Sequence, residues 1–205
     1  AVTYTVSASN SGGSTSAEVN ITINDVAPSI SYSYNDITGT KGVAISPHSG
    51  PTTSGGTITS WEISPSPGSA FQFNSANGQI SGTPSTVLSR TQYTIWANNS
   101  GGSSLATINI TVLHEAPMFT YSSYDLILEN NTEMTAIEAT VIGGDITSWD
   151  IESSIPLGLV LGTTNGTIFG TPTVVQSMTM YQIWGNNSGG SHSVFINITI
   201  SDPIV

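Results

Sequence analysis

The sequence repeats itself with a period of 88 to 89 residues, and this period constrains the fold more than any other feature. The segment GGTITSWEIS begins at Gly55 and recurs as GGDITSWDIE from Gly143, 88 residues later. YTIWANNSGGS from Tyr93 recurs as YQIWGNNSGGS from Tyr181 with the same shift, and YTVSASNSGGS from Tyr4 precedes Tyr93 by 89 residues. The chain is therefore predicted to be a tandem array of one structural unit.

Prolines divide the array into its units. Pro28, Pro117 and Pro203 follow the last alternating segment of each period, where proline favours extended chain and interrupts a strand ladder. A lone hairpin has too little core to be stable, so we expect the first segment to be completed by strands of a longer chain or by another subunit. The predicted segments are residues 1–27, the C-terminal hairpin of an upstream repeat, and two full domains, residues 28–116 and 117–205.

The pattern of apolar residues predicts an all-β chain. In residues 106–112 every second residue is apolar and the others are Thr or Asn, which is the period of a half-buried strand and not of a helix. Trp61 and Trp149 stand two residues before Ile63 and Ile151 in such strands, so both rings are predicted to fill a core.

Two kinds of turn are expected in each period. Asn-Gly at residues 77–78 and 165–166 predicts a type I′ hairpin turn, in which both residues take positive φ. Ser-Gly-Gly, beginning at Ser11, Ser100 and Ser188, is predicted to close the last hairpin of each period.

Charge and cysteine content exclude several classes of function. Lys41 and Arg90 are the only strong bases against 13 acids, so the formal net charge is -11. Nucleic acid is therefore not expected as a partner, because phosphate binding needs clustered basic residues. The absence of cysteine excludes disulfides and thiolate metal sites, and the sequence has no membrane-length apolar run that predicts direct insertion.

The repeated motifs resemble a known family. NGQISGTPS at residues 77–85 and NGTIFGTPT at residues 165–173, each followed by a YxIWxNNSGGS strand and turn, are similar to the Putative Ig domains of the haemagglutinin type. That family occurs as tandem repeats in bacterial and archaeal surface proteins. The resemblance implies immunoglobulin-like β-sandwiches, an extracellular or cell-surface location, an adhesive or spacer role, and no catalysis.

Asparagine sequons are the most numerous candidate sites. Seven N-x-S/T motifs are candidates for N-linked glycans, although a chain this rich in Asn, Ser and Thr produces such motifs by composition alone. Three of them are predicted on the outward face of the same strand in successive periods. The seven candidates are Asn20, Asn98, Asn109, Asn130, Asn165, Asn186 and Asn197.

Two tryptophans precede sequons by two residues, on the same strand face. Trp96 before Asn98 and Trp184 before Asn186 are predicted to stack on a linked sugar or, alternatively, to pack on a neighbouring domain or subunit. In the first segment both equivalents are serine, so ring and sequon are absent together.

Calcium is the one candidate cofactor, because acids near the predicted junctions supply the oxygen ligands that this cation prefers. These acids do not repeat in register, since Asp25 aligns with His114, and this weakens the case. The weak calcium candidates are Asp25, Asp36, Glu115, Asp125 and Asp202. No other cofactor is predicted.

Enzyme chemistry has no predicted participants. His48, His114 and His192 are not equivalent in the repeat, and no metal-binding, nucleophile or phosphate-binding motif accompanies them. We therefore predict a chain that is not an enzyme.

Two functional hypotheses follow. The first is a structural repeat segment of an extracellular surface protein, which forms a stalk or assembles into a filament or sheath. Its partners would be neighbouring repeats or copies of itself, contacted through the tryptophans and apolar residues such as Phe195. The alternative is an adhesin or carbohydrate-binding module, in which Trp96 and Trp184 bind an external ligand.

Overall fold

The computed structural model describes residues 1–46 and 50–204, and β-strands make up the regular secondary structure of these residues. The prediction of an all-β chain is confirmed. The chain forms two compact units, one of residues 1–37, 46–82 and 91–109, the other of residues 38–45, 83–90 and 110–205. Both units contain parts of residues 28–116, so the predicted domain boundaries stay predictions. We call residues 1–27 the leading hairpin, residues 28–116 the first repeat and residues 117–205 the second repeat. His48 lies outside the described residues.

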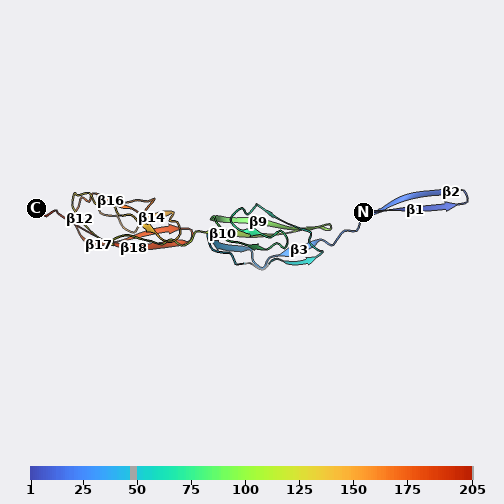
Figure 1. Ribbon diagram of the computed structural model, residues 1–205, viewed down its shortest axis with the longest axis horizontal. Helices are drawn as coiled ribbons and strands as arrows, with labels where there is room; N and C mark the ends of the chain where they lie inside the picture. Colours follow the sequence, from blue (N-terminus) through green and yellow to red (C-terminus); the bar gives the residue numbers. More distant parts are fainter. Residues whose placement is uncertain (47–49, 205) are drawn as a thin grey trace. The chain divides into compact units, whose positions relative to one another are not determined.

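The leading hairpin is a two-stranded ribbon (Figure 1). Strand β1 (Val2–Asn10) pairs antiparallel with β2 (Gly13–Ile21), and the register from Val2↔Ile21 to Asn10↔Gly13 leaves only Ser11 and Gly12 in the turn. The predicted Ser-Gly-Gly closure is confirmed here. All residues of both strands are exposed to solvent, including the apolar ones.

The first repeat has a four-stranded sheet and two small ones. In the large sheet the buried residues alternate along the two long strands, with Ile95, Ile108 and Ile110 fully buried. Its order is β4 (Asp36–Thr40), β10 (Gly102–Leu113), β9 (Leu88–Asn99) and β6 (Ser60–Ser64); the small sheets pair β3 (Pro28–Ser31) with β5 (Thr52–Gly55) and β7 (Gln72–Phe73) with β8 (Ile80–Ser81).

The second repeat has the same arrangement of strands. Its outer strand β12 runs parallel to β18, from Asp125↔Asn197 to Glu129↔Ser201, and the other pairs are antiparallel. The large sheet has the order β12 (Asp125–Glu129), β18 (Gly190–Ser201), β17 (Gln176–Asn187) and β14 (Ser148–Ile151); the small sheets pair β11 (Phe119–Thr120) with β13 (Thr140–Val141) and β15 (Leu159–Leu161) with β16 (Ile168–Gly170).

The core of the second repeat is built from the inward residues of these strands around one aromatic group. The Phe119 ring is fully buried and meets Trp149 edge to face, with ring centroids 4.6 Å apart. Ile183 and Ile198 from the two long strands are 1% exposed and belong to the same cluster. The predicted role of Trp149 as a core residue is confirmed, and Trp61, 9% exposed, is buried in the first repeat.

The Asn-Gly turns differ from the predicted type I′ geometry. Gly78 and Gly166 have φ of 71° and 69°, but Asn77 and Asn165 do not have positive φ, and residues 74–79 rather than two residues join β7 to β8. Each Asn instead accepts a hydrogen bond through Oδ1 from the backbone N–H two residues later. This Asx geometry stabilises a wider turn, so the prediction of two left-handed residues was wrong.

A tryptophan explains why the turn needs its glycine. A methyl group at Gly166 would overlap the Trp149 ring, and one at Gly78 would overlap Trp61. The Tyr121 hydroxyl donates a hydrogen bond to the Gly166 carbonyl, and burial raises the pKa of Tyr121, which keeps this donor protonated. The turn, the tryptophan and the tyrosine thus close one end of the core together.

Candidate functional site

The outer face of each large sheet displays the tryptophan and sequon asparagine that the sequence singled out. Trp96 pairs across the sheet with Glu62, and Trp184 pairs with Asp150, so a carboxylate stands beside each ring. Both rings are partly buried rather than fully exposed. Each ring therefore retains a free surface that a ligand, a sugar or another protein can contact.

The two sequons beside these rings differ in their hydrogen bonds. Asn98 Nδ2 donates to Glu62 Oε1 at 3.1 Å. In the second repeat the equivalent acid is the shorter Asp150, whose Oδ1 accepts from the Ile151 N–H at 2.8 Å. We find no side-chain hydrogen bond at Asn186 within residues 1–46 and 50–204. The Asn186 amide is thus available, whereas the Asn98 amide is engaged.

The three sequons of the repeated last strand lie on β2, β10 and β18. Asn197 Nδ2 donates to Asp125 Oδ1 at 2.7 Å, and Asn109 Nδ2 donates to the Asn35 carbonyl at 3.3 Å. Asn20 Oδ1 accepts a hydrogen bond from the Thr3 hydroxyl. Asn20 is exposed, and Asn109 and Asn197 are partly exposed. Their modification stays a prediction.

The remaining two sequons have structural bonds. Asn130 Nδ2 donates to Asp202 Oδ1 at 3.0 Å, and its own Oδ1 is buried without a hydrogen-bond partner. Asn165 belongs to the Asx turn described above. An N-linked sugar on Asn130 would compete with the Nδ2 bond to Asp202, whereas the Asn165 turn uses Oδ1, which the linkage of a sugar to Nδ2 leaves unchanged.

A second, unpredicted feature is a backbone-binding site at the tip of the last hairpin in the first repeat. Asn99 Nδ2 donates to the Val26 carbonyl at 2.7 Å, and Ser100 Oγ accepts from the Asp25 N–H at 3.0 Å. The Ser100 hydroxyl also donates to Asp25 Oδ2 at 2.8 Å. A methyl group on Gly101 would overlap the Asp25 carbonyl. The tip therefore holds the linker that enters its own repeat.

The second repeat holds its entering linker in the same way. Asn187 Nδ2 donates to the Glu115 carbonyl at 2.8 Å, and Ser188 Oγ accepts from the His114 N–H at 3.0 Å. A methyl group on Gly189 would overlap the His114 carbonyl, and one on Gly144 would overlap that of Glu115. We call this arrangement, built from residues 99–101 or 187–189, the linker clamp.

The linker clamp gives the Asn-Ser-Gly sequence a role that sequence reasoning did not assign. The sequence alone indicates only a hairpin closure for Ser-Gly-Gly, because the hydrogen bonds of the linker clamp join residues more than 70 positions apart. A signal was present, however, in the recurrence of Gly55-Gly56 as Gly143-Gly144. This glycine pair does not close a hairpin, so its recurrence indicates a place where another segment of backbone approaches closely.

The candidate calcium ligands do not come together. No group of three or more His, Cys, Asp or Glu residues is placed to hold a metal ion among residues 1–46 and 50–204. Asp25, Asp125 and Asp202 each accept a hydrogen bond from a side chain. Among the histidines, His114 lies in the linker, and the His192 ring contacts Phe119 edge to face, 5.1 Å between centroids.

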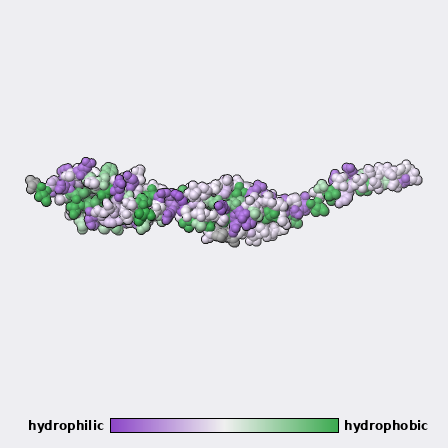
Figure 2. All heavy atoms as spheres, in the orientation of Figure 1, coloured by the Kyte–Doolittle hydropathy of each residue, from purple (hydrophilic) through white to green (hydrophobic). Residues whose placement is uncertain are grey.

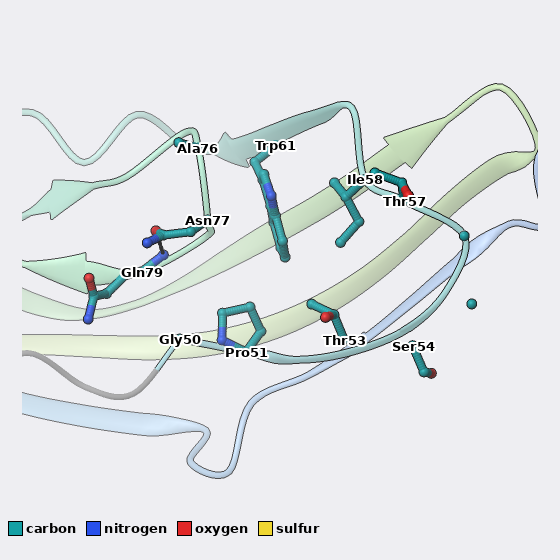
Figure 3. Close-up of a pocket in the computed structure, with 12 residues that line it drawn as sticks. Gly50, Pro51, Thr53, Ser54, Thr57, Ile58, Trp61, Ala76, Asn77 and Gln79 are labelled. Atoms are coloured by element: carbon teal, nitrogen blue, oxygen red, sulfur yellow. Dashed lines mark hydrogen bonds between the residues drawn. The ribbon is translucent and has the colours of Figure 1, made fainter.

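A surface hollow of about 620 Å³ lies beside Trp61 in the first repeat. Figure 3 shows Trp61 and Ile58 directed toward Pro51 and Thr53, with Asn77 and Gln79 at the other end. The residues that line it carry amides and hydroxyls but no acid, base or histidine. This composition suits hydrogen bonding to a neutral polar ligand and offers no group for acid–base catalysis.

Comparisons with known proteins agree with the fold. Residues 117–201 match the model of the family described as Putative Ig domain. Two structures of a three-Ig-domain fragment of the I-band of titin, one of them an E-to-A variant, are each 16% identical to this chain, with a TM-score of 0.50. Each alignment covers 97% of this chain and 74% of the titin fragment. Four N-terminal Ig domains of Dscam1 align with 12% identity and a TM-score of 0.49 over 88% of this chain and 47% of theirs.

These likenesses extend to the fold and no further. The chain has the tandem immunoglobulin-like β-sandwich architecture, and the prediction of this fold class and of the family resemblance is confirmed. No curated protein matches the sequence. None of the described residues forms a helix with the length and apolarity required to span a membrane.

Proposed function

We propose that this chain, whose second repeat matches an Ig-domain family, is a structural segment of an extracellular surface protein that holds its repeats in series as a stalk. It carries no catalytic role in this proposal. Its partners are the neighbouring repeats of the same chain, and its sequon asparagines are sites for sugars. Sequons in every segment and the resemblance to surface-protein repeats support the extracellular location.

The observation that carries the proposal is the recurrence of the linker clamp. Both linkers described here, residues 25–27 and 114–116, are bound by the repeat that follows them through equivalent atoms. A protein whose repeats only had to be tethered would not need a specific site for each linker. Repeats that must resist reorientation do need such a site, because a bound linker has fewer conformations than a free one.

Small-angle X-ray scattering of the full chain tests this role. We expect the wild-type chain to have a narrow distribution of maximum dimensions. The double variant Asn187→Ala, Ser188→Ala should broaden this distribution. The matched control is Asn10→Ala with Ser11→Ala, at equivalent positions in the leading hairpin, which bind no linker among residues 1–46 and 50–204. Equal flexibility of all three proteins would contradict the stalk. Protease treatment of intact source cells tests the location, because an internal protein would be protected.

Carbohydrate binding is a second candidate, favoured by the hollow beside Trp61. An aromatic ring together with the side-chain amides of Asn77 and Gln79 is a combination that suits a neutral sugar. Screening the chain against a glycan array distinguishes the two functions, with Gln79→Ala as the site variant. Binding that this variant removes would favour the adhesin over the stalk.

A further inference from the structure

The two repeats have the same fold but different outer faces. In the second repeat Met180, Phe195 and Ile127 are 60%, 49% and 82% exposed. The equivalent residues of the first repeat are Gln92, Thr107 and Thr38, all exposed and polar. Because these positions are exposed in both repeats, folding does not require them to be apolar. Another pressure must account for the apolar residues of the second repeat.

Three apolar side chains of this face lie on two neighbouring strands. Phe195 on β18 pairs with Gln182 on β17, so Met180 and Trp184 are its diagonal neighbours on the same face. Diagonal neighbours in a sheet are within reach of long and aromatic side chains. We call Met180, Trp184 and Phe195 the apolar stripe. Ile127 extends this face on the outer strand β12, opposite Thr199.

Carboxylates flank the apolar stripe on both sides. Asp150 on β14 pairs with Trp184, and Asp125 on β12 pairs with Asn197, which itself pairs with Met180. The second repeat contains eight Asp and Glu residues and no Lys or Arg, whereas the first repeat has three acids and two bases. Figure 2 shows green and purple residues close together over the second repeat, while the leading hairpin is mostly pale.

This combination selects the chemistry of a partner. An apolar surface with acidic borders attracts an apolar segment with basic borders, and repels a second copy of itself, an anionic membrane and nucleic acid. A glycan on Asn197 does not explain the stripe, because the first repeat has the same sequon at Asn109 but polar residues at the positions of Met180 and Phe195. The face thus differs between the repeats in a way that sequons do not.

We propose that the apolar stripe of the second repeat is a docking site for a protein segment in which large apolar side chains are flanked by Lys or Arg. The segment lies across β17 and β18 with its apolar side chains on Phe195 and Met180. Its basic side chains reach Asp125 and Asp150. This inference is independent of the proposed stalk, since a stalk does not require apolar residues at the positions of Met180 and Phe195.

Titration of the full chain with a fluorescent synthetic peptide that alternates Lys with Leu and Phe tests the proposal. The repeats themselves supply the variant: Phe195→Thr with Met180→Gln places the residues of the first repeat in the second. We expect this variant to weaken binding by a factor of about ten or more, because it removes two large apolar side chains from the contact; tenfold corresponds to about 1.4 kcal/mol. The matched control, Thr107→Ala with Gln92→Ala, should leave affinity unchanged.

Charge provides the second arm. Asp125→Asn with Asp150→Asn should weaken binding and reduce its dependence on salt, because both carboxylates would no longer attract the basic borders. A peptide with Glu in place of Lys should not bind. Equal affinity for both peptides, or unchanged affinity of the Phe195 and Met180 variant, would overturn the proposal. The proposal would also be overturned if the Lys peptide failed to bind and the chain instead associated with itself or with phosphatidylcholine vesicles. In that case the Phe195 and Met180 variant would abolish the association.

Discussion

The leading hairpin and the last hairpin of the second repeat are built from equivalent sequences and have opposite environments. Tyr4, Val6 and Ile21 are 52%, 58% and 47% exposed, whereas the equivalent Tyr181, Ile183 and Ile198 are 5%, 1% and 1% exposed. Both hairpins keep the same register at the turn, Asn10↔Gly13 and Asn187↔Gly190. Alternation and turn residues therefore determine the hairpin, and burial depends on the strands that pack against it.

The same contrast holds at the hairpin tips. Asn187 Oδ1 accepts the Gly189 N–H, just as Asn10 Oδ1 accepts the Gly12 N–H in the leading hairpin. In addition, Asn187 Nδ2 and Ser188 Oγ bind the entering linker of the second repeat. Among the described residues, one face and the tip of the hairpin make contacts in the second repeat that the leading hairpin does not make. Substitutions at equivalent positions separate what a residue does for the hairpin from what it does for the assembled repeat.

The largest difference is expected in the core. Ile198→Ala removes a fully buried side chain and should lower the free energy of unfolding by ~2–5 kcal/mol. Ile21→Ala at the equivalent exposed position should change it by no more than about 0.5 kcal/mol. Urea unfolding followed by tryptophan fluorescence measures both. Equal effects would mean that the Ile21 face is covered in solution.

The next difference is expected at the glycine of the linker clamp. Gly189→Ala places a methyl group on the His114 carbonyl and should displace the linker, at a cost of about 1–3 kcal/mol. Gly12→Ala should have a much smaller effect, because the nearest atom to its methyl group is Asn10 Oδ1 at 3.2 Å. Amide hydrogen exchange at His114 reports the displacement directly. Unaltered exchange at His114 in the Gly189 variant would show that the linker is held by other contacts.

A smaller effect is expected for the hydroxyl of the linker clamp. Ser188→Ala removes the acceptor of the His114 N–H. The free energy of unfolding should fall by ~1 kcal/mol, the typical net contribution of one hydrogen bond. Ser11→Ala removes no linker bond and should be neutral. Ser188→Thr retains the hydroxyl and should restore protection of the His114 amide, which distinguishes the hydrogen bond from a loss of packing.

The smallest effect is expected for the ion pair between Lys41 and Asp145, whose Nζ and Oδ2 atoms are 3.2 Å apart. Both side chains are well exposed, so Lys41→Gln should lower stability by less than about 0.5 kcal/mol. The loss should vanish at high salt. A loss comparable to that of Ser188→Ala would place this pair among the main contacts of the linker region.

The sequence predicted the strands well because their information is local. Alternation in residues 106–112 and the Ser-Gly-Gly turns depend on neighbours in the chain, and both were recovered. The linker clamp was not predicted, because its hydrogen bonds join Asn187 to Glu115 and Ser188 to His114 across most of a repeat. The prediction for the Asn-Gly turns was wrong for a related reason, since each turn packs against Trp61 or Trp149, a contact that the dipeptide alone does not reveal.

The candidate sites were recovered only in part. Phe195 was expected to make contacts as an apolar surface residue, and it lies at the centre of the apolar stripe. The sequence could not tell that Glu62 accepts a hydrogen bond from Asn98, while Asp150 accepts one from the Ile151 N–H. The choice depends on how each carboxylate is oriented, which the repeat motif does not encode.

The linker clamp also bears on how such a chain can change over generations. Each repeat binds the linker on its N-terminal side, mostly through backbone groups, so Asp25-Val26-Ala27 and His114-Glu115-Ala116 fit equivalent sites despite different side chains. A linker and the repeat behind it are therefore a self-contained module. Duplication or deletion of one module leaves every remaining connector with its own receptor, so the length of the array can vary by gene rearrangement without new compensating substitutions.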